Sequence, residues 1–173
     1  ASYPDIDWDE KMFAFLKKFD LIRDPITTQI DNYENLTDCF DAIKRINTVL
    51  IDLNRDLWSY ISMNYIKQKV IKEEVGSSTM PHKINPISFE NAEGNLGLSN
   101  ASFVFLASRL SRSRLQRDLS GSTLFRNVGV AFGHSLLAYK NIVVGLKRIH
   151  PNTKQLSLEL ENQWSVLAEA IQT

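Results

Sequence analysis

Apolar residues recur every three or four positions along most of the chain, the spacing that places them on one face of an α-helix. The longest run extends from about Tyr33 to Lys69 without glycine or proline, and a helix of that length would be roughly 50 Å long. Asn47, Asn54 and Asn64 interrupt it and are expected on a polar face or in hydrogen bonds between helices. The run itself is carried by Leu36, Phe40, Ile43, Ile46, Leu50, Leu53, Leu57 and Ile61.

Two more long helices are predicted, one from Pro86 to about Leu110 and one beginning near Gly121. The first contains Gly94 and Gly97, and since glycine costs about 1 kcal/mol relative to alanine inside a helix, these two indicate a close backbone approach or a local bend. The second carries the apolar residues Val128, Phe132, Leu136, Tyr139, Val143 and Leu146.

Shorter helices are predicted near both ends of the sequence. Asp5 or Asp7 can cap the first, whose apolar residues are expected to face the core. A turn at 150–152 precedes the last, which Asn152 or Thr153 can cap and which runs through Leu156, Leu160 and Trp164. The predicted fold class is therefore all-α, a bundle of long helices. The apolar sides that the helices of this chain leave uncovered predict packing against partner helices from other chains.

Composition narrows the choice of function. The 173 residues are 43% hydrophobic, enough for one core, and 20 basic residues balance 20 acidic ones. That balance gives no general attraction to nucleic acid or to a membrane, and no apolar run is long enough to span a bilayer. Cys39 is the only cysteine, which suits a reducing compartment, so a cytoplasmic location is expected.

The segment Gly76–Pro86, with the sequence GSSTMPHKINP, carries the chemistry of a site. Asn85 and Pro86 form a favourable N-cap and first-turn pair for the helix that follows. The N–H groups of that helix start and the charge of Lys83 favour a carboxylate, so an anionic substrate is implied. A solvated connector between two helices is the other interpretation of these residues taken alone.

A cluster of arginines lies between the second and third long helices. Arg109, Arg112, Arg114 and Arg117 fit the carboxyl end of a helix, where cations are favourable. They also fit a phosphate site, because guanidinium groups bind phosphate oxygens in pairs and the hydroxyls of 122–123 and Arg126 follow closely. The residues alone leave both interpretations open.

The segment 76–86 matches every fixed position of G-S-S-x-M-P-x-K-x-N-P and so resembles the signature of the fumarase/aspartase superfamily. His82 before the lysine points to the adenylosuccinate lyase or carboxymuconate cycloisomerase branch. The segments 89–100 (FENAEGNLGLSN) and 116–127 (QRDLSGSTLFRN) resemble the bacterial adenylosuccinate lyase pattern. The resemblance covers nearly the whole chain.

This resemblance implies β-elimination of fumarate from adenylosuccinate, giving AMP, and from the succinylcarboxamide ribotide of purine biosynthesis. It implies that Ser77 is the catalytic base and that Lys83 and Asn85 stabilise the charge on the substrate carboxylate. Neither a cofactor nor a metal is required. Implied substrate contacts are Gln29, Ser78, Lys83, Ile84, Asn85, Asn91, Arg117, Ser122, Thr123, Leu124, Phe125 and Arg126.

The resemblance also implies a homotetramer whose active sites are each assembled from three subunits. Its general acid is a histidine on a segment N-terminal to this chain, and His82, His134 and His150 do not match that motif. Residues 1–173 are therefore expected to be a fragment, mainly the central helical domain, with the N- and C-terminal domains largely absent and negligible activity alone. The alternatives are a sister enzyme, of the argininosuccinate lyase or carboxymuconate cycloisomerase type, and a non-catalytic bundle such as the related crystallins.

Overall fold

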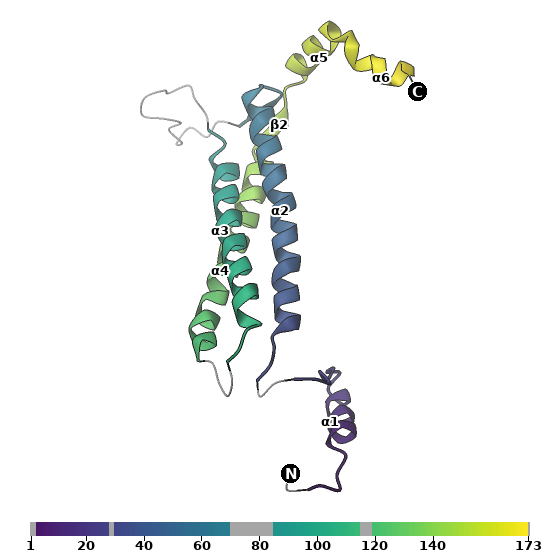
Figure 1. Ribbon diagram of the computed structural model, residues 1–173. Coiled ribbons are helices and arrows are strands. Elements are labelled where there is room, and N and C mark those ends of the chain that lie inside the picture. Colours follow the sequence, from purple (N-terminus) through teal and green to yellow (C-terminus); the bar gives the residue numbers. More distant parts are fainter. Residues whose placement is uncertain (1–2, 28–29, 70–84, 115–118, 173) are drawn as a thin grey trace.

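Three long helices run side by side and form the body of the molecule (Figure 1). The computed structural model describes residues 3–27, 30–69, 85–114 and 119–172, without the side chains of residues 166 and 169. Helix α3 (Ile87–Leu110) packs along both α2 (Glu34–Ser62) and α4 (Ser120–Lys147). The predicted all-α bundle is confirmed.

Helix α2 ends at Ser62, earlier than the apolar pattern predicts. Asn64 adopts a left-handed backbone conformation with φ of 64°, which a regular helix cannot accommodate. The chain then forms strand β1 (Ile66–Gln68), which pairs antiparallel with β2 (Ile149–Pro151) in the register Ile66 to Pro151. The predicted turn at 150–152 is therefore partly a strand, and its partner lies more than 80 positions earlier in the sequence, where no local signal could reveal it.

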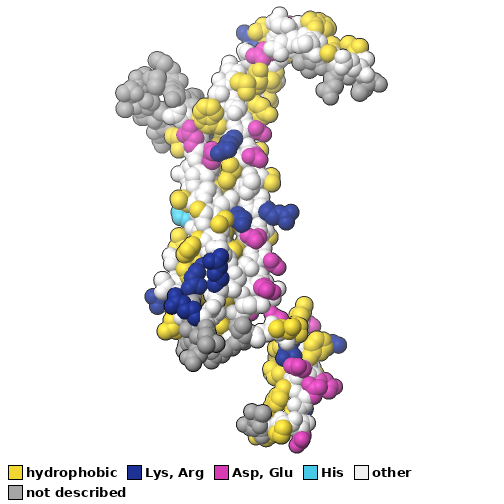
Figure 2. Space-filling view, viewed as in Figure 1, with side chains coloured by type: hydrophobic (Ala, Val, Ile, Leu, Met, Phe, Trp, Pro, Cys, Tyr) yellow, Lys and Arg dark blue, Asp and Glu magenta, His cyan; other side chains and the backbone are white. Residues whose placement is uncertain are grey.

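Helix α1 (Trp8–Lys17) begins as predicted, because the N–H of Glu10 donates to Asp7 Oδ1 over 3.0 Å. The expectation that it faces a core is wrong for this chain. No residue of α1 is buried, and Figure 2 shows yellow apolar side chains on the surface of this separate segment. The helix lies beyond the end of the bundle, where none of the three long helices covers it (Figure 1).

The last predicted helix is shorter than expected. Helix α5 (Thr153–Asn162) ends before Trp164, which begins the 3₁₀ helix η1 (Trp164–Leu167), and α6 (Ala168–Gln172) follows. Asn152 stands at the N-cap position of α5, but its side chain does not cap the helix. It is buried, and its Nδ2 donates to the carbonyl of Asn64 over 2.8 Å, so it ties α5 to the turn after α2.

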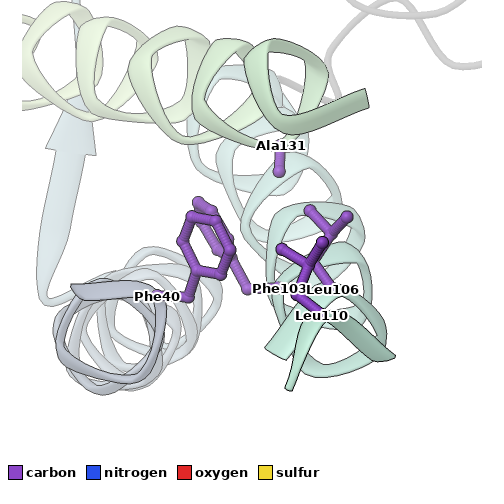
Figure 3. Packing of buried hydrophobic residues seen from close by; sticks show 5 residues of the cluster. All are labelled: Phe40, Phe103, Leu106, Leu110 and Ala131. Carbon is purple, nitrogen blue, oxygen red and sulfur yellow. The ribbon is translucent and has the colours of Figure 1, made fainter. Parts of the chain in front are cut away.

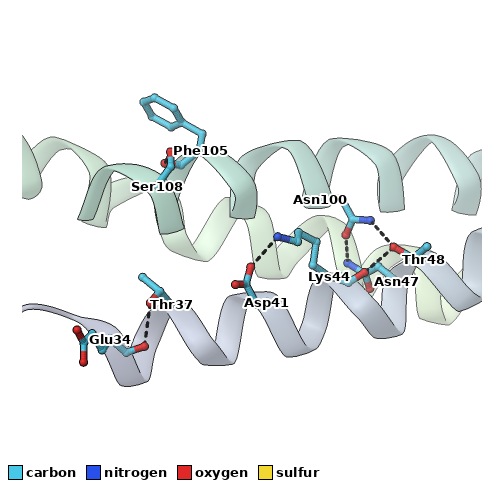
Figure 4. Close-up of polar contacts among 9 residues, drawn as sticks. All are labelled: Glu34, Thr37, Asp41, Lys44, Asn47, Thr48, Asn100, Phe105 and Ser108. Atoms are coloured by element: carbon cyan, nitrogen blue, oxygen red, sulfur yellow. Dashed lines mark hydrogen bonds and ion pairs between the residues drawn. The ribbon is translucent and has the colours of Figure 1, made fainter. Parts of the chain in front are cut away.

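Two apolar clusters and one polar layer fill the bundle. Phe40, Phe103, Leu106, Leu110 and Ala131 form the first cluster (Figure 3), and Ala92, Leu96, Ala138 and Ile142 form the second. Between them along all three helices lies a polar layer, in which the buried Asn47 Nδ2 donates to Ser99, Asn100 and Ser135 (Figure 4 shows the bond to Asn100).

The close approach expected at Gly94 and Gly97 is absent among the described residues, where a Cβ atom at either position would have no neighbour within 4 Å. It occurs instead at Gly145 on α4. A Cβ atom there would lie 2.7 Å from Cζ of the buried Phe89 ring. Gly145 therefore lets the ring at the start of α3 pack against the backbone of α4.

Candidate functional site

The predicted site residues fall in three groups. Ser77, Ser78, Lys83 and Ile84 lie outside the described residues, as do Gln29 and Arg117. Asn85 and Asn91 are described near the start of α3. Ser122, Thr123, Leu124, Phe125 and Arg126 are described in the first two turns of α4.

At the start of α3, the N-cap position is occupied by Pro86 and not by Asn85, and neither side chain caps the helix. The carbonyl of Asn85 accepts a hydrogen bond from the N–H of Ile87 over 2.9 Å, which places Asn85 just before the first turn. Pro86 is buried and Asn85 is half-buried. The burial of Pro86 therefore fixes where α3 begins in the bundle.

Asn91, about one turn into α3, is exposed but tightly held. Its Oδ1 accepts from Asn95 Nδ2 at 2.7 Å and from Asn141 Nδ2 of α4 at 3.0 Å. Two donors therefore converge on one carboxamide oxygen. Sequence reasoning missed Asn95 and Asn141, because their role depends on the pairing of α3 with α4.

Next to Asn91, α2 and α3 are joined by polar contacts. Arg55 Nε donates to Glu93 Oε1 over 2.8 Å, and Trp58 Nε1 donates to Glu90 Oε1 over 2.9 Å. The bond to Glu93 and the charge of that carboxylate raise the pKa of Arg55. Together with Ser59, these four residues line an open groove between α2 and α3.

At the other end of the bundle, a cavity of about 220 Å³ opens between the end of α3 and the start of α4. Figure 2 shows dark-blue basic side chains gathered at this end. The cavity joins Arg109 and Arg112 of the predicted cluster to Ser122 and Phe125. Its other lining residues are Ile30, Tyr33, Leu110, Leu119 and Gly121.

Arg109, near the end of α3, lines this cavity and bonds to residues on both sides of it. Its Nη1 donates to the carbonyl of Arg112 over 3.0 Å, and its Nη2 donates to Ser120 Oγ. Because these contacts lie on either side of the α3–α4 connection, the guanidinium holds the end of one helix against the beginning of the next. The positions of Arg109 and Arg112 are thus compatible with both interpretations of the cluster, cations at a helix end and a phosphate site.

The α4 residues differ in where they lie. The Phe125 and Tyr33 rings meet edge to face with centroids 5.0 Å apart, and Ser122 Oγ donates to the carbonyl of Leu119 over 2.8 Å. Leu124 packs against the first apolar cluster instead. Thr123 and Arg126 are exposed and do not line the cavity. Tyr33 was not predicted, since only the folded structure brings it to Phe125.

The two described groups of predicted site residues lie at opposite ends of the bundle (Figure 1). Helix α3 separates them with 24 residues, which corresponds to roughly 36 Å at the usual rise per residue. One small molecule therefore cannot touch Asn85 and Ser122 of the same chain.

Comparison with known proteins decides the family. Residues 4–99 match the family described as "Lyase", and residues 113–173 match "Adenylosuccinate lyase C-terminal". The chain belongs to the lyase family, whose model matches more than half of it. Over all of its length it is 51% identical to the adenylosuccinate lyase of Legionella pneumophila (strain Corby), 52% to that of Dictyostelium discoideum and 50% to that of Escherichia coli (strain K12).

The chain spans 38% of the length of each of these lyases. Within the described residues, no helix combines the length and apolar character needed to cross a membrane. In the same part of the chain, no cluster of histidine, cysteine and acidic side chains is arranged to hold a metal ion.

Proposed function

We propose that this chain is the central helical domain of an adenylosuccinate lyase, with the N- and C-terminal domains supplied by the rest of the protein. The observation that carries the proposal is about 50% identity to curated adenylosuccinate lyases across the full 173 residues. The enzyme eliminates fumarate from adenylosuccinate to give AMP, and from the succinylcarboxamide ribotide of purine biosynthesis. It acts in the cytoplasm.

In the proposed reaction, the Ser77 side chain removes the proton from the carbon next to a substrate carboxylate. The bond from the neighbouring carbon to nitrogen then breaks, its electron pair goes to nitrogen, and a histidine outside this chain protonates the leaving group. A serine is a weak base at neutral pH unless nearby positive charge, N–H donors and exclusion of water stabilise its alkoxide. Ser78 binds the substrate beside it, and Gln29 and Ile84 add contacts.

Negative charge builds up on the carboxylate during proton removal. Lys83, Asn85 and the N–H groups at the start of α3 stabilise that charge, because fixed donors aimed at developing charge lower the barrier most. The position of Asn85 immediately before the first turn of α3 supports this role. Asn91 contacts the substrate from the same end of the helix.

The nucleotide part of the substrate binds at the opposite end of the bundle. Arg117, Ser122, Thr123, Leu124, Phe125 and Arg126 supply its contacts. The cavity that joins Arg112 to Ser122 and Phe125 supports this assignment, since guanidinium and hydroxyl groups suit phosphate oxygens and an aromatic ring suits a base.

The two ends meet only between different chains. Because roughly 36 Å separates them along α3, a complete site requires residues from more than one subunit, and we infer a homotetramer with three subunits at each site. The exposed apolar residues of the long helices, among them Ile46, Val49 and Leu136, support association through the bundle.

The test is fumarate release from adenylosuccinate by the full-length parent protein, followed by absorbance. The parent should turn over, Ser77→Ala should lose nearly all activity with its fold intact, and Ser102→Ala on α3 should match the parent. Turnover with another fumarate adduct alone would favour a sister lyase, and an inactive parent would favour a non-catalytic bundle. Residues 1–173 alone should show no turnover, because the general acid is absent.

A further inference from the structure

A network of hydrogen-bonded side chains connects Asn91 and Asn95 on α3 to His134 and Asn141, which are half-buried on α4. Asn95 Nδ2 donates to the backbone carbonyl of Asn91 at 2.8 Å and to Asn91 Oδ1 at 2.7 Å. Asn141 Nδ2 reaches the same oxygen at 3.0 Å, and Asn95 Oδ1 lies 2.8 Å from His134 Nδ1. The helices α3 and α4 contribute two members each.

The backbone carbonyl fixes the direction of every bond in this network. A carbonyl oxygen only accepts, so the Asn95 atom facing it must be the NH₂ group. The same NH₂ group faces Asn91, whose facing atom must then be the acceptor Oδ1. On its other side Asn95 presents Oδ1, so His134 Nδ1 must carry a hydrogen and donate.

This direction leaves the NH₂ group of Asn91 pointing away from the network. Among the described residues, none accepts a hydrogen bond from Asn91 Nδ2, and the side chain is exposed. Rotating the amide by half a turn would place its NH₂ group against the NH₂ groups of Asn95 and Asn141. The network therefore opposes that rotation and holds a donor outward.

We propose that Asn95, Asn141 and His134 are positioning residues that hold Asn91 as a hydrogen-bond donor toward an oxygen acceptor of the substrate, a carboxylate or a carbonyl. The inference rests on the proposed function, in which Asn91 contacts the substrate. It adds the polarity of that contact and three residues that maintain it. Asn95 is the central member, since it connects Asn91 to His134.

The polarity is tested in the full-length enzyme with Asn91→Asp beside Asn91→Ala. Aspartate has nearly the same shape and still accepts from Asn95 and Asn141, but it cannot donate. If the Asn91 side chain donates to the substrate, kcat/KM falls at least as far for Asn91→Asp as for Asn91→Ala, by about tenfold or more. Activity retained by Asn91→Asp and lost by Asn91→Ala would overturn the assignment.

The positioning role is tested by a double-mutant cycle on kcat/KM. Asn95→Ala should lower it about tenfold in the parent but less than about twofold when Asn91 is already alanine, because the effect passes through Asn91. His134→Ala should lower kcat/KM in the same pattern, with a smaller loss in the parent and almost none when Asn91 is already alanine. Asn100→Ala, which removes an amide contact elsewhere on α3, should leave kcat/KM within about twofold in both backgrounds.

Equal losses from Asn95→Ala in the two backgrounds would indicate a structural contribution only and would overturn the inference. So would full activity of Asn95→Ala, or of Asn91→Ala, in an active parent. Failure of the proposed function is recognised separately, since the parent itself would then release no fumarate from adenylosuccinate, and the inference would fall with it.

Discussion

Two levels of the same three-helix bundle are held together by different interactions, aromatic packing at one and hydrogen bonds at the other. At the level of Phe40 and Phe103, the rings stack with centroids 5.0 Å apart, and Phe132 meets both edge to face. One to two helical turns further along the bundle, the central side chain is Asn47 and not an aromatic ring. Its Nδ2 lies 3.3 Å from Ser99 Oγ and 2.9 Å from Ser135 Oγ. Both levels are fully buried at their centres.

The difference matters for how the helices are aligned. Apolar contacts are non-directional, so an aromatic level contributes free energy but tolerates small shifts along the helix. Hydrogen bonds to Asn47 are directional, and a shift would leave buried groups unpaired at a cost of about 1–3 kcal/mol each. We infer that the aromatic level contributes most of the stability, while the polar layer fixes which residues of α2, α3 and α4 stand opposite one another.

The largest expected effect is at the aromatic level. Phe103 is fully buried and contacts both other rings, so Phe103→Ala should lower the free energy of unfolding by about 3–5 kcal/mol through lost apolar burial and a cavity. Denaturant unfolding of the 173-residue chain measures it. Phe105, 56% exposed on the same helix, is the matched control, and Phe105→Ala should change the value by less than about 0.5 kcal/mol.

The polar layer should be the next most sensitive. Asn47→Ala removes the partner of Ser99, Ser135 and the Tyr139 hydroxyl, which donates to Asn47 Oδ1 at 2.6 Å. The expected loss is about 2–3 kcal/mol, because buried polar groups lose their partners together. Asn162→Ala on the exposed surface of α5 is the control. If Asn47→Ala unfolds at the denaturant concentration of the parent, the polar layer does not hold the alignment.

These two levels differ in how far the sequence predicts them. The three-to-four spacing that places Phe40 in a core is a local signal, and the structure confirms it. The same local signal describes Asn47 only as an interruption, since its partners lie 52 and 88 positions away. Of the other asparagines in that run, Asn54 is buried as a bundle residue, whereas Asn64 ends the helix.

The site residues show the same division. The sequence motif predicted Ser122 and Phe125 as site residues, and in the structure both line one cavity. The motif could not reveal Tyr33 or the network around Asn91, because both depend on which side chains meet after the helices pack. It equally could not show that Leu124 turns toward the apolar cluster.

A third contact tests whether packing near the start of α3 is as tight as at the aromatic level. Gly145→Ala places a methyl group against the buried Phe89 ring, and overpacking should outweigh the gain in helix propensity, for a net loss of about 1–2 kcal/mol. Gly133→Ala has open space in this chain and should raise the free energy of unfolding by up to about 1 kcal/mol. Equal shifts for the two variants would show that Phe89 moves aside.

The smallest effect is expected outside the bundle, at the hydrogen bond between Tyr65 in the turn after α2 and Glu159 on α5. Because both groups titrate, the pH dependence of stability distinguishes this contact from the buried levels. The Tyr65 hydroxyl donates to Glu159, and Gln155 Nε2 donates to the same carboxylate at 2.9 Å. The bond to Glu159 raises the pKa of Tyr65, and the bond from Tyr65 lowers the pKa of Glu159. Since the folded pKa of Glu159 lies below its unfolded value, its contribution is present above about pH 4.3 and is lost as pH falls through the folded value. For Tyr65 the sign reverses, so its contribution is present below about pH 10 and is lost as pH rises through the folded value.

Tyr65→Phe should therefore lower Tm slightly between these limits, and the difference from the parent should shrink at acidic pH. Tyr60→Phe, at an exposed ring on α2, should leave Tm unchanged across the range. A Tm difference for Tyr65→Phe that stays constant down to pH values at which carboxylates are protonated would exclude the charged Glu159 as the partner that matters.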